Sequence, residues 1–263
     1  MSKKLGLALG SGGARGVAHL GLLRALEDNG IKPDYIAGCS MGAVVGGVYA
    51  SGVSVEKIYE ILKGLKKRDI ISINPAALFK GAILRSGKVF SHLKENLATK
   101  NIEDFPVKFC CVATDALSGK PHIFKSGDAA LAIQASSTIP AVFEPVRKGD
   151  RLFIDGGCTC RVPIRIVKEM GADIVIAMDV LSNCSKPVDE LHGILSVVLR
   201  AFDIMDAQAS AFRFEREAKF CDLLLQPEMN GLSQYSVKDA YKAYEEGYLL
   251  AKKNITKIKN LLV

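Results

Sequence analysis

Two short apolar segments near the start of the chain each lead directly into a tight turn and then into a helical pattern. Leu5–Leu9 precedes a glycine-rich turn at residues 10–16, and Tyr35–Cys39 precedes Ser40 and the small-residue segment Met41–Ala50. Parallel strands need such crossover helices, because each helix returns the chain to the edge where the next strand begins. These two units therefore predict an α/β fold.

The same alternation continues along the chain. Further strands are expected at residues 108–113, 152–154, 174–180 and 221–225, and helices at 17–29, 128–136, 164–170, 189–218 and 237–262. Buried strands separated by helices predict a mostly parallel central sheet with helices on both faces, a three-layer α/β/α architecture. A chain of 263 residues is near the upper size for one hydrophobic core, so we expect a single domain over residues 1–263.

Composition excludes several other classes of protein. No stretch approaches 18 uninterrupted apolar residues, so a transmembrane span is not expected. The first apolar run ends at Gly10 and is too short for the core of a signal peptide, which predicts a cytoplasmic location. The seven cysteines lack the spacing of a disulfide framework or a metal site. We therefore expect no metal, and we interpret the thiols as small buried side chains.

The positive charge of the chain is concentrated in one segment. Residues 61–100 carry nine Lys or Arg against two Asp or Glu, which accounts for the whole net charge of +7. Apolar residues such as Phe79 lie between these charges, a combination that suits an anionic membrane surface. We expect this excursion to form a lid or docking edge; a solvated surface that only aids solubility is the alternative. Nucleic acid is not an expected partner, because the rest of the chain is neutral.

The glycine-rich turn reads Gly10-Ser11-Gly12-Gly13-Ala14-Arg15-Gly16. A dinucleotide fingerprint would need a small residue in place of Arg15 and an acidic residue at the end of the next strand, and both are absent. No Gly-Lys-Ser/Thr follows, so a phosphate-binding P-loop is also excluded, and no nucleotide cofactor is expected. What remains is a turn whose backbone N–H groups lie at a helix N-terminus, an arrangement that can stabilise an oxyanion.

The second turn reads Gly38-Cys39-Ser40-Met41-Gly42, a G-x-S-x-G sequence between a strand and a helix. In that position Gly38 and Gly42 permit the sharp turn that presents a nucleophilic serine above a sheet. We therefore predict that Ser40 is a nucleophile.

A nucleophilic serine needs a base. The α/β-hydrolase order would require a histidine after the acid, and His192 is the only histidine that follows Asp155, at the start of a long helix. A triad of Ser40, Asp155 and His192 is kept as an alternative. His19 is expected to be a structural histidine on an apolar helix, and His92 and His122 show no partner in the sequence. Asp155 ends a buried strand and is followed by two glycines that allow another backbone to come close. We expect Asp155 itself to be the base.

Taken together, the three motifs resemble the patatin-like phospholipase family, over roughly residues 5 to 225. The segment Ala135-Ser136-Ser137-Thr138-Ile139-Pro140-Ala141-Val142-Phe143 also resembles the family's sequence before its catalytic aspartate. The resemblance implies a patatin-like fold and a serine lipid acyl hydrolase that cleaves phospholipids or other fatty-acyl esters without a cofactor.

The resemblance also implies a role for each motif residue. Ser40 and Asp155 would form a catalytic dyad, and the N–H groups of Gly12 and Gly13 would form the oxyanion hole. The remaining motif residues would shape these groups: Arg15 and Gly16 support the loop, Gly38 and Gly42 flank the nucleophile, and Gly156 and Gly157 follow the proton acceptor.

One position departs from the family pattern. Many members carry Asn six residues after the catalytic aspartate, where this chain has Arg161. An arginine near Asp155 would lower the pKa of that carboxyl group and weaken it as a base, whereas one turned away would have no effect. A weakly active or inactive acyl-ligand-binding or regulatory protein on the same fold is therefore the alternative function. The motifs carry no information on headgroup, acyl-chain length or oligomeric state.

Overall fold

The computed structural model of the protein describes residues 3–64, 87–182, 193–234 and 240–263. Their strands form one sheet in the order β5-β6-β3-β2-β1-β7-β8, with β4 paired to β3. The strands are β1 (Leu5–Leu9), β2 (Tyr35–Cys39), β3 (Lys108–Asp115), β4 (Lys120–Phe124), β5 (Val146–Lys148), β6 (Arg151–Asp155), β7 (Ile174–Met178) and β8 (Leu223–Leu225).

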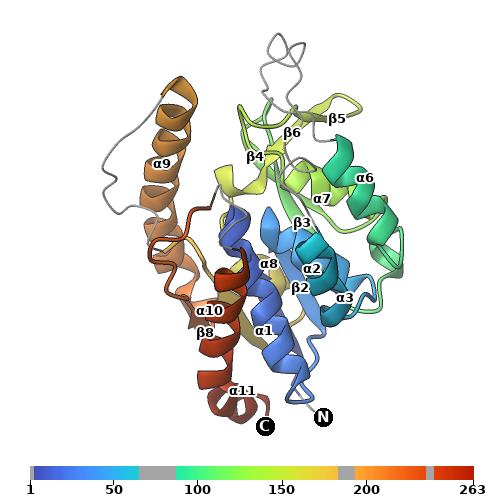
Figure 1. Cartoon of the computed structure of the whole chain (residues 1–263), viewed down its shortest axis with the longest axis vertical. Helices are drawn as coiled ribbons and strands as arrows, with labels where there is room; N and C mark the ends of the chain where they lie inside the picture. The colour runs from blue at the N-terminus through green and yellow to red at the C-terminus, as the bar shows by residue number, and fades with distance from the viewer. Residues whose placement is uncertain (1–2, 65–86, 183–192, 235–239) are drawn as a thin grey trace.

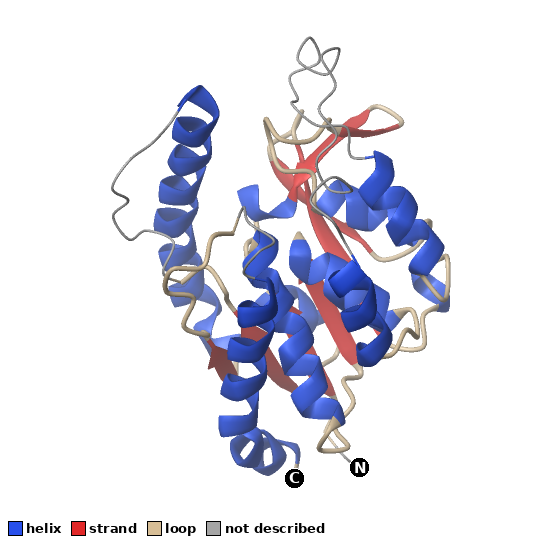
Figure 2. Cartoon of the chain, in the orientation of Figure 1, coloured by secondary structure: helices blue, strands red, loops and turns tan. Residues whose placement is uncertain are grey.

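Helices lie in front of and behind this sheet (Figure 2). They are α1 (Ala18–Glu27), α2 (Met41–Ala50), α3 (Val55–Gly64), α6 (Gly87–Asn96), α7 (Ala129–Ser136), α8 (Ile164–Glu169), α9 (Gly193–Glu217), α10 (Ala240–Lys253) and α11 (Ile255–Leu262). A short 3-10 helix, η1 (Gly13–Val17), precedes α1.

The sheet is mostly parallel, as predicted. Five strands run parallel to one another, in the order β3, β2, β1, β7 and β8. Strands β4 and β6 are antiparallel to β3, and β5 is antiparallel to β6. Strands β4 and β5 were not predicted, because these half-exposed edge strands lack the continuous apolar run of a central strand. The three-layer α/β/α prediction is confirmed.

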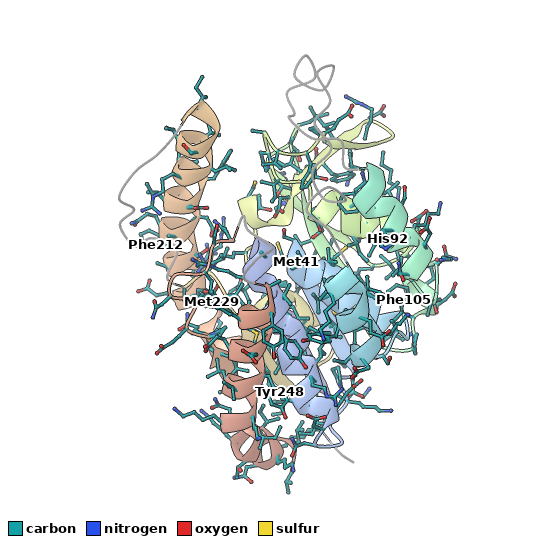
Figure 3. All side chains as sticks on the ribbon, in the orientation of Figure 1. Met41, His92, Phe105, Phe212, Met229 and Tyr248 are labelled. Carbon is teal, nitrogen blue, oxygen red and sulfur yellow. The ribbon has the colours of Figure 1, made fainter. Side chains whose placement is uncertain are left out.

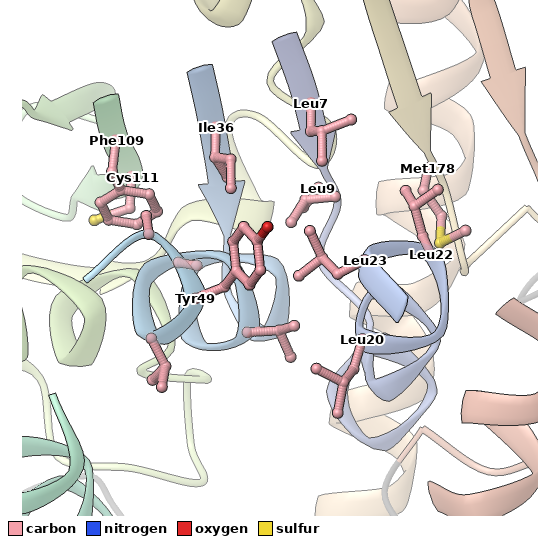
Figure 4. Packing of buried hydrophobic residues seen from close by; sticks show 14 of the residues in the cluster. Leu7, Leu9, Leu20, Leu22, Leu23, Ile36, Tyr49, Phe109, Cys111 and Met178 are labelled. Atoms are coloured by element: carbon pink, nitrogen blue, oxygen red, sulfur yellow. The ribbon is translucent and has the colours of Figure 1, made fainter. Parts of the chain in front are cut away.

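Alternate residues of the strands feed two different cores. Leu5, Leu7 and Leu9 point into a large cluster beneath α1 and α2, together with Ile36 and Met178 (Figure 4). On the opposite face the strands present small side chains, which pack with α8 in a thinner cluster of Ala8, Ala37, Cys110, Val162, Ile164, Val167, Ala172, Val175 and Ala177. This difference in side-chain size lets α8 approach the sheet closely.

The small residues of α2 serve a similar close approach. A Cβ atom at Gly42 would collide with the carbonyl oxygen of Leu9, and one at Gly46 would lie 2.8 Å from Ile36. Helix α2 is therefore buried with its backbone close to the sheet, and it begins directly after Ser40.

Several other predictions need correction. The single helix expected at residues 237–262 is two helices, because the chain breaks at Asn254 between α10 and α11. Cys39, Cys110 and Cys111 are buried as expected, but Cys158 is exposed. Within the basic segment, Phe90 is buried and packs edge-on against Phe143, so part of that segment belongs to the core.

The centre of the predicted lid, residues 65–86, lies outside the described residues. No helix within the described ranges is both long and apolar enough to span a bilayer.

The contact between α1 and α10 depends on two facing glycines, which gives a stability prediction. A Cβ at Gly21 would collide with the carbonyl oxygen of Tyr244, and one at Gly247 would collide with that of Ala18. Gly21→Ala should therefore lower the free energy of unfolding by about 1–3 kcal/mol, because the helices must move apart. Urea unfolding followed by circular dichroism measures this change.

Gly64→Ala is the matched control, since no described atom lies within 4 Å of its added Cβ. It should leave stability unchanged or slightly raised, because alanine favours helix. Equal stability of the two variants would contradict the close packing of α1 on α10.

Candidate active site

Strands β2 and β6 pair with the same side of β3, and their last residues lie next to each other. In the first half of β3, Val112 pairs with Cys39 of β2, and in its second half Ala113 pairs with Asp155 of β6. Strand β4 occupies the other side of β3 throughout this stretch. Since β2 is parallel and β6 antiparallel to β3, their final residues meet at adjacent positions. This register brings the residue after Cys39 next to Asp155, although 115 residues separate them.

Ser40 adopts a strained conformation at this junction. Its φ of 52° lies in the region that non-glycine residues rarely occupy. The backbone is held there by Ser136, which accepts a hydrogen bond from Ser40 N at 3.0 Å and donates one to Val112 O at 2.6 Å. Ser137 Oγ donates to Ser40 O at 3.2 Å. A non-glycine residue kept in such a conformation by buried partners is typical of a functional turn.

The glycines that flank Ser40 and Asp155 allow these backbones to touch. A Cβ at Gly38 would lie 2.6 Å from Ala43, one residue beyond Gly42 in the first turn of α2. A Cβ at Gly156 would collide with the carbonyl oxygen of Val112 and lie 3.0 Å from Cys39 Sγ. The structure thus explains Gly38, Gly42 and Gly156 by space.

The side chains of Ser40 and Asp155 are hydrogen-bonded. Ser40 Oγ donates to Asp155 Oδ2 at 2.6 Å, and Gly157 N donates to Asp155 Oδ1 at 2.8 Å. Both residues are almost fully buried, with 4% and 5% of their surface exposed. Each carboxylate oxygen therefore has one donor, and the serine hydroxyl is oriented toward a group that can accept its proton.

Burial raises the pKa of Asp155 to about 6, because the charged form loses its hydration. The hydrogen bonds from Ser40 and Gly157 oppose this shift, and the negative charge of Asp206 adds to it. A carboxylate with a pKa near 6 is a much better general base near neutral pH than an exposed aspartate.

The glycine loop is fixed from several sides. His19 is buried and its pKa is lowered to about 4 by burial, so its neutral ring donates from Nε2 to Gly10 O at 2.8 Å. Arg15 Nε donates to Leu232 O at 2.8 Å, and a Cβ at Gly16 would lie 2.5 Å from Met41. These contacts hold the loop at Gly10, Arg15 and Gly16.

The two loop amides expected to bind an oxyanion lie between amides that are already used. Ser11 N donates to Arg161 O and Ala14 N donates to Gln234 O, both at 2.9 Å, whereas no such backbone pairing exists within the described residues for Gly12 N and Gly13 N. Gly13 has a φ of +50°, and a Cβ atom there would collide with the carbonyl oxygen of Gln234. Gly13 also lines the pocket that holds Ser40 and Asp155.

Arg161 fits neither of the two expectations, an arginine that lowers the pKa of Asp155 or one that is turned away from it. The side chain points inward, yet its guanidinium binds Asp179 at 2.7 Å and Asp206 at 2.9 Å. Two carboxylates thus more than offset the positive charge, and the pKa of Asp155 is raised, not lowered. The arginine instead links the loop after β6 to α9.

A pocket of about 320 Å³ opens over Ser40 and Asp155. Helix α9 forms one wall with Leu199, Phe202, Met205 and Ala209, and the rest of the apolar lining comes from Ile139, Pro140 and Leu181. The polar groups at its edge include Asp203, which accepts a hydrogen bond from Gln234 Nε2 at 2.7 Å. A narrow apolar pocket above a serine suits an acyl chain better than a polar substrate.

Other candidate groups lie away from this pocket. His92 is exposed on α6, and His122 of β4 contacts Arg151 of β6. His192 of the alternative triad lies outside the described residues. In the described part of the chain, no cluster of three or more His, Cys, Asp or Glu side chains could hold a metal ion.

Several residues that hold the site in place were not predicted from the sequence. Ser136 and Ser137 lie in the segment 135–143 that resembles the family, but nothing in that segment indicates hydrogen bonds to the Ser40 backbone. Gln234 and Asp206 lie far along the chain, and no local pattern predicts their contacts with the glycine loop and Arg161.

The family model and the curated relatives that match this chain agree with one another. The family model described as patatin-like phospholipase matches residues 7–168. An uncharacterized NTE family protein of Mycobacterium tuberculosis is 38% identical over 71% of this chain and 51% of its own length. The lysophospholipase NTE1 of Pyricularia oryzae is 33% identical over 68% of this chain and 12% of its own length. The chain thus spans about half the length, or less, of these curated relatives.

Solved structures share the fold at low identity. VipD from Legionella pneumophila superposes with a TM-score of 0.51 and 14% identity, over 97% of this chain and 67% of VipD. The type III effector protein ExoU gives a TM-score of 0.50 and 11% identity, over 97% of this chain and 53% of ExoU. At these identities the likeness concerns the fold alone.

The raised pKa of Asp155 predicts a pH-dependent effect on stability. The folded pKa of about 6 exceeds the unfolded value of about 3.9, so ionisation costs stability as the pH rises between them. Asp155→Asn removes that cost. Its free energy of unfolding relative to wild type should increase by about 3 kcal/mol between about pH 4 and about pH 7. Urea unfolding at a series of pH values provides the measurement.

Ser40→Ala serves as the control, because it keeps the buried carboxyl group and removes only a hydrogen bond that opposes the pKa shift, so its stability should fall with rising pH at least as steeply as that of wild type. If Asp155→Asn differs from wild type by the same amount at both ends of the pH range, Asp155 does not ionise with a raised pKa.

Proposed function

Because the chain belongs to the patatin-like phospholipase family, we propose that it is a serine lipid acyl hydrolase that uses a Ser40–Asp155 dyad. The observation that carries this proposal is the buried 2.6 Å hydrogen bond from Ser40 Oγ to Asp155, at a strained turn that faces an apolar pocket. The proposed oxyanion hole consists of the N–H groups of Gly12 and Gly13.

In the first half of the proposed reaction, Ser40 Oγ attacks the carbonyl carbon of a fatty-acyl ester while its proton passes to Asp155 Oδ2. The carbonyl oxygen becomes an oxyanion that accepts hydrogen bonds from Gly12 and Gly13, whose position before η1 and α1 adds the positive end of the helix dipole. The intermediate collapses, the alcohol leaves with the proton from Asp155, and the acyl group remains on Ser40.

In the second half, water attacks the acyl-serine and Asp155 accepts its proton. The oxyanion forms again in the same place, and its collapse releases the fatty acid while Ser40 Oγ regains the proton from Asp155. The carboxylate must be ionised at the start of each half, which a pKa of about 6 permits at neutral pH.

The substrate is proposed to be a lipid with a single acyl chain in the pocket. A volume of about 320 Å³ is at the small end of ligand sites, and its lining near Ser40 is mostly apolar. A relative named as a lysophospholipase supports a phospholipid that has already lost one chain.

We also propose that the protein works in the cytoplasm and contacts the inner face of an anionic membrane. This part of the proposal rests on the nine basic against two acidic residues at positions 61–100.

The dyad predicts the effect of two substitutions. Ser40→Ala and Asp155→Asn should each remove nearly all hydrolysis of a soluble p-nitrophenyl ester, and the double variant should be no worse than either, because the two groups act as a unit. A fluorophosphonate should label wild type but not Ser40→Ala. The kcat/KM of wild type should fall below a pH of about 6, as Asp155 becomes protonated.

The chain contains a matched control pair. Ser118 Oγ donates to Asp115 at 2.9 Å outside the pocket, so Ser118→Ala and Asp115→Asn should keep full activity. Near wild-type turnover in Ser40→Ala would exclude the dyad. Absence of both labelling and turnover in folded wild type would instead favour an acyl-ligand-binding protein.

The basic segment predicts a charge effect on membrane binding. Changing Lys66, Lys67 and Arg68 together to Glu should weaken binding to vesicles that contain phosphatidylglycerol, since each basic residue near an anionic leaflet contributes about 1 kcal/mol. The salt dependence of binding should also become shallower. Co-sedimentation with vesicles at several salt concentrations measures both effects.

The control changes Lys252, Lys253 and Lys257 to Glu, which alters the net charge equally on exposed positions of α10 and α11. Equal loss of binding in both triple variants would show that net charge, and not this segment, attracts the protein to the membrane.

A further inference from the structure

Helix α9 exposes an unusual number of large apolar side chains. A helix on the surface of a protein normally turns its apolar residues inward and its charges toward water. Here five of the ten exposed large apolar side chains in the described part of the chain lie on α9: Ile194, Val197, Ile204, Met205 and Phe212, which are 45–85% exposed. Ala201 is exposed as well. We call these six residues the outer stripe.

The outer stripe follows one face of the helix. Ile194, Val197, Ala201 and Ile204 follow one another at spacings of three or four residues, Met205 lies next to Ile204, and Phe212 lies seven residues after Met205, so the stripe follows one face over about 27 Å. The exposed side chains that the structure describes from Ile194 through Phe212 carry no charge. Figure 1 shows α9 at the edge of the molecule, and Figure 3 shows Phe212 along its outer side.

The two acidic residues in the middle of α9, Asp203 and Asp206, are directed toward the protein. Asp206 binds Arg161 at 2.9 Å and accepts a hydrogen bond from the buried Ser210 at 3.1 Å. Asp203 binds Gln234 at 2.7 Å. These contacts fix the rotation of the helix, so the apolar face cannot turn inward without breaking a buried ion pair.

The outer stripe is continuous with the pocket that contains Ser40. Met205 is 58% exposed and also lines that pocket, next to Phe202 and Ala209 of the same helix. An apolar surface thus runs from solvent along α9 to the serine. A protein partner seated on this stripe would cover the pocket entrance at Met205, whereas a lipid leaflet there would supply acyl chains to it.

We propose that the outer stripe of α9 is a membrane-docking surface that lies in the lipid headgroup layer and guides an acyl chain past Met205 to Ser40. The guiding role rests on the proposed lipid acyl hydrolase function. A helix with one apolar face lies in the plane of the interface and inserts that face by about 5–10 Å. Docking by this surface depends on burial of apolar side chains, so it operates on uncharged leaflets and resists salt, unlike attraction by the basic segment.

The test compares two double variants with the same change in charge. Val197→Asp with Ile204→Asp alters the outer stripe at positions that do not line the pocket, and Leu117→Asp with Leu249→Asp alters exposed apolar residues elsewhere. Binding to phosphatidylcholine vesicles should fall at least about tenfold in the first variant and remain unchanged in the second, because a leaflet excludes the new carboxylates. Wild-type binding should change little with salt.

Hydrolysis separates docking from catalysis. The stripe variant should cleave a monomeric p-nitrophenyl butyrate as fast as wild type and lose hydrolysis only of lipid in vesicles. Ser40→Ala should bind vesicles like wild type without cleaving them. If folded wild type cleaves no ester but binds vesicles through the stripe, the proposed function fails and the docking surface stands.

Two results would overturn the docking surface. The first is equal vesicle binding by wild type and the stripe variant, whatever their activity. The second is a wild-type dimer in light scattering that the stripe substitutions dissociate while vesicle binding persists, since a second copy of the chain would then cover α9.

Discussion

The pairing of two strand ends along one side of β3 is the constraint on which the rest of the site depends. Because β2 and β6 stop at neighbouring positions, Val112 and Ala113, the residues that follow have no room to continue straight. Ser40 is forced into a positive φ, and Gly156 passes against the Val112 carbonyl where a side chain would not fit. The same crowding removes water from Asp155 and raises its pKa. Geometry and basicity therefore have one cause.

The guanidinium of Arg161 lies near this site, and its positive charge is already taken up by ion pairs. Arg161 is buried between Asp179 and Asp206, so it supplies a rigid connection instead of a free positive charge. One carboxylate already balances the single positive charge of Arg161, so the second leaves the buried cluster with excess negative charge, and Asp206 accordingly adds to the rise in the pKa of Asp155. Asp206 belongs to α9, so the helix that forms the pocket wall also contributes to the basicity of Asp155.

Local sequence patterns predicted the elements that carry their own signals. The bounds of β2 and α2 agree with the prediction, because the turn glycines and the small-residue helix are encoded within a few positions. The contact of Ser40 with Asp155 was expected from the place of Asp155 at the end of a buried strand and from the family resemblance, whereas its cause, the register on β3, is a long-range property. The partners of Arg161 and the orientation of α9 were not predictable, since an alternating pattern of apolar and acidic residues does not reveal which face meets the protein. The break at Asn254 also lacked a glycine or proline to mark it.

The contact of Gly13 and Arg15 with Gln234 and Leu232 has a consequence for how this protein can be divided. All three sequence motifs lie before residue 168, within the part that the family model matches. Yet the loop is held by carbonyl groups at positions 232 and 234, and β1 is hydrogen-bonded to β7 at Ile174–Met178. The segment that contains the motifs is thus not structurally independent. A chimera that transfers the site to another protein would have to include the chain through residue 234, because the last third of the polypeptide holds the glycine loop in its conformation.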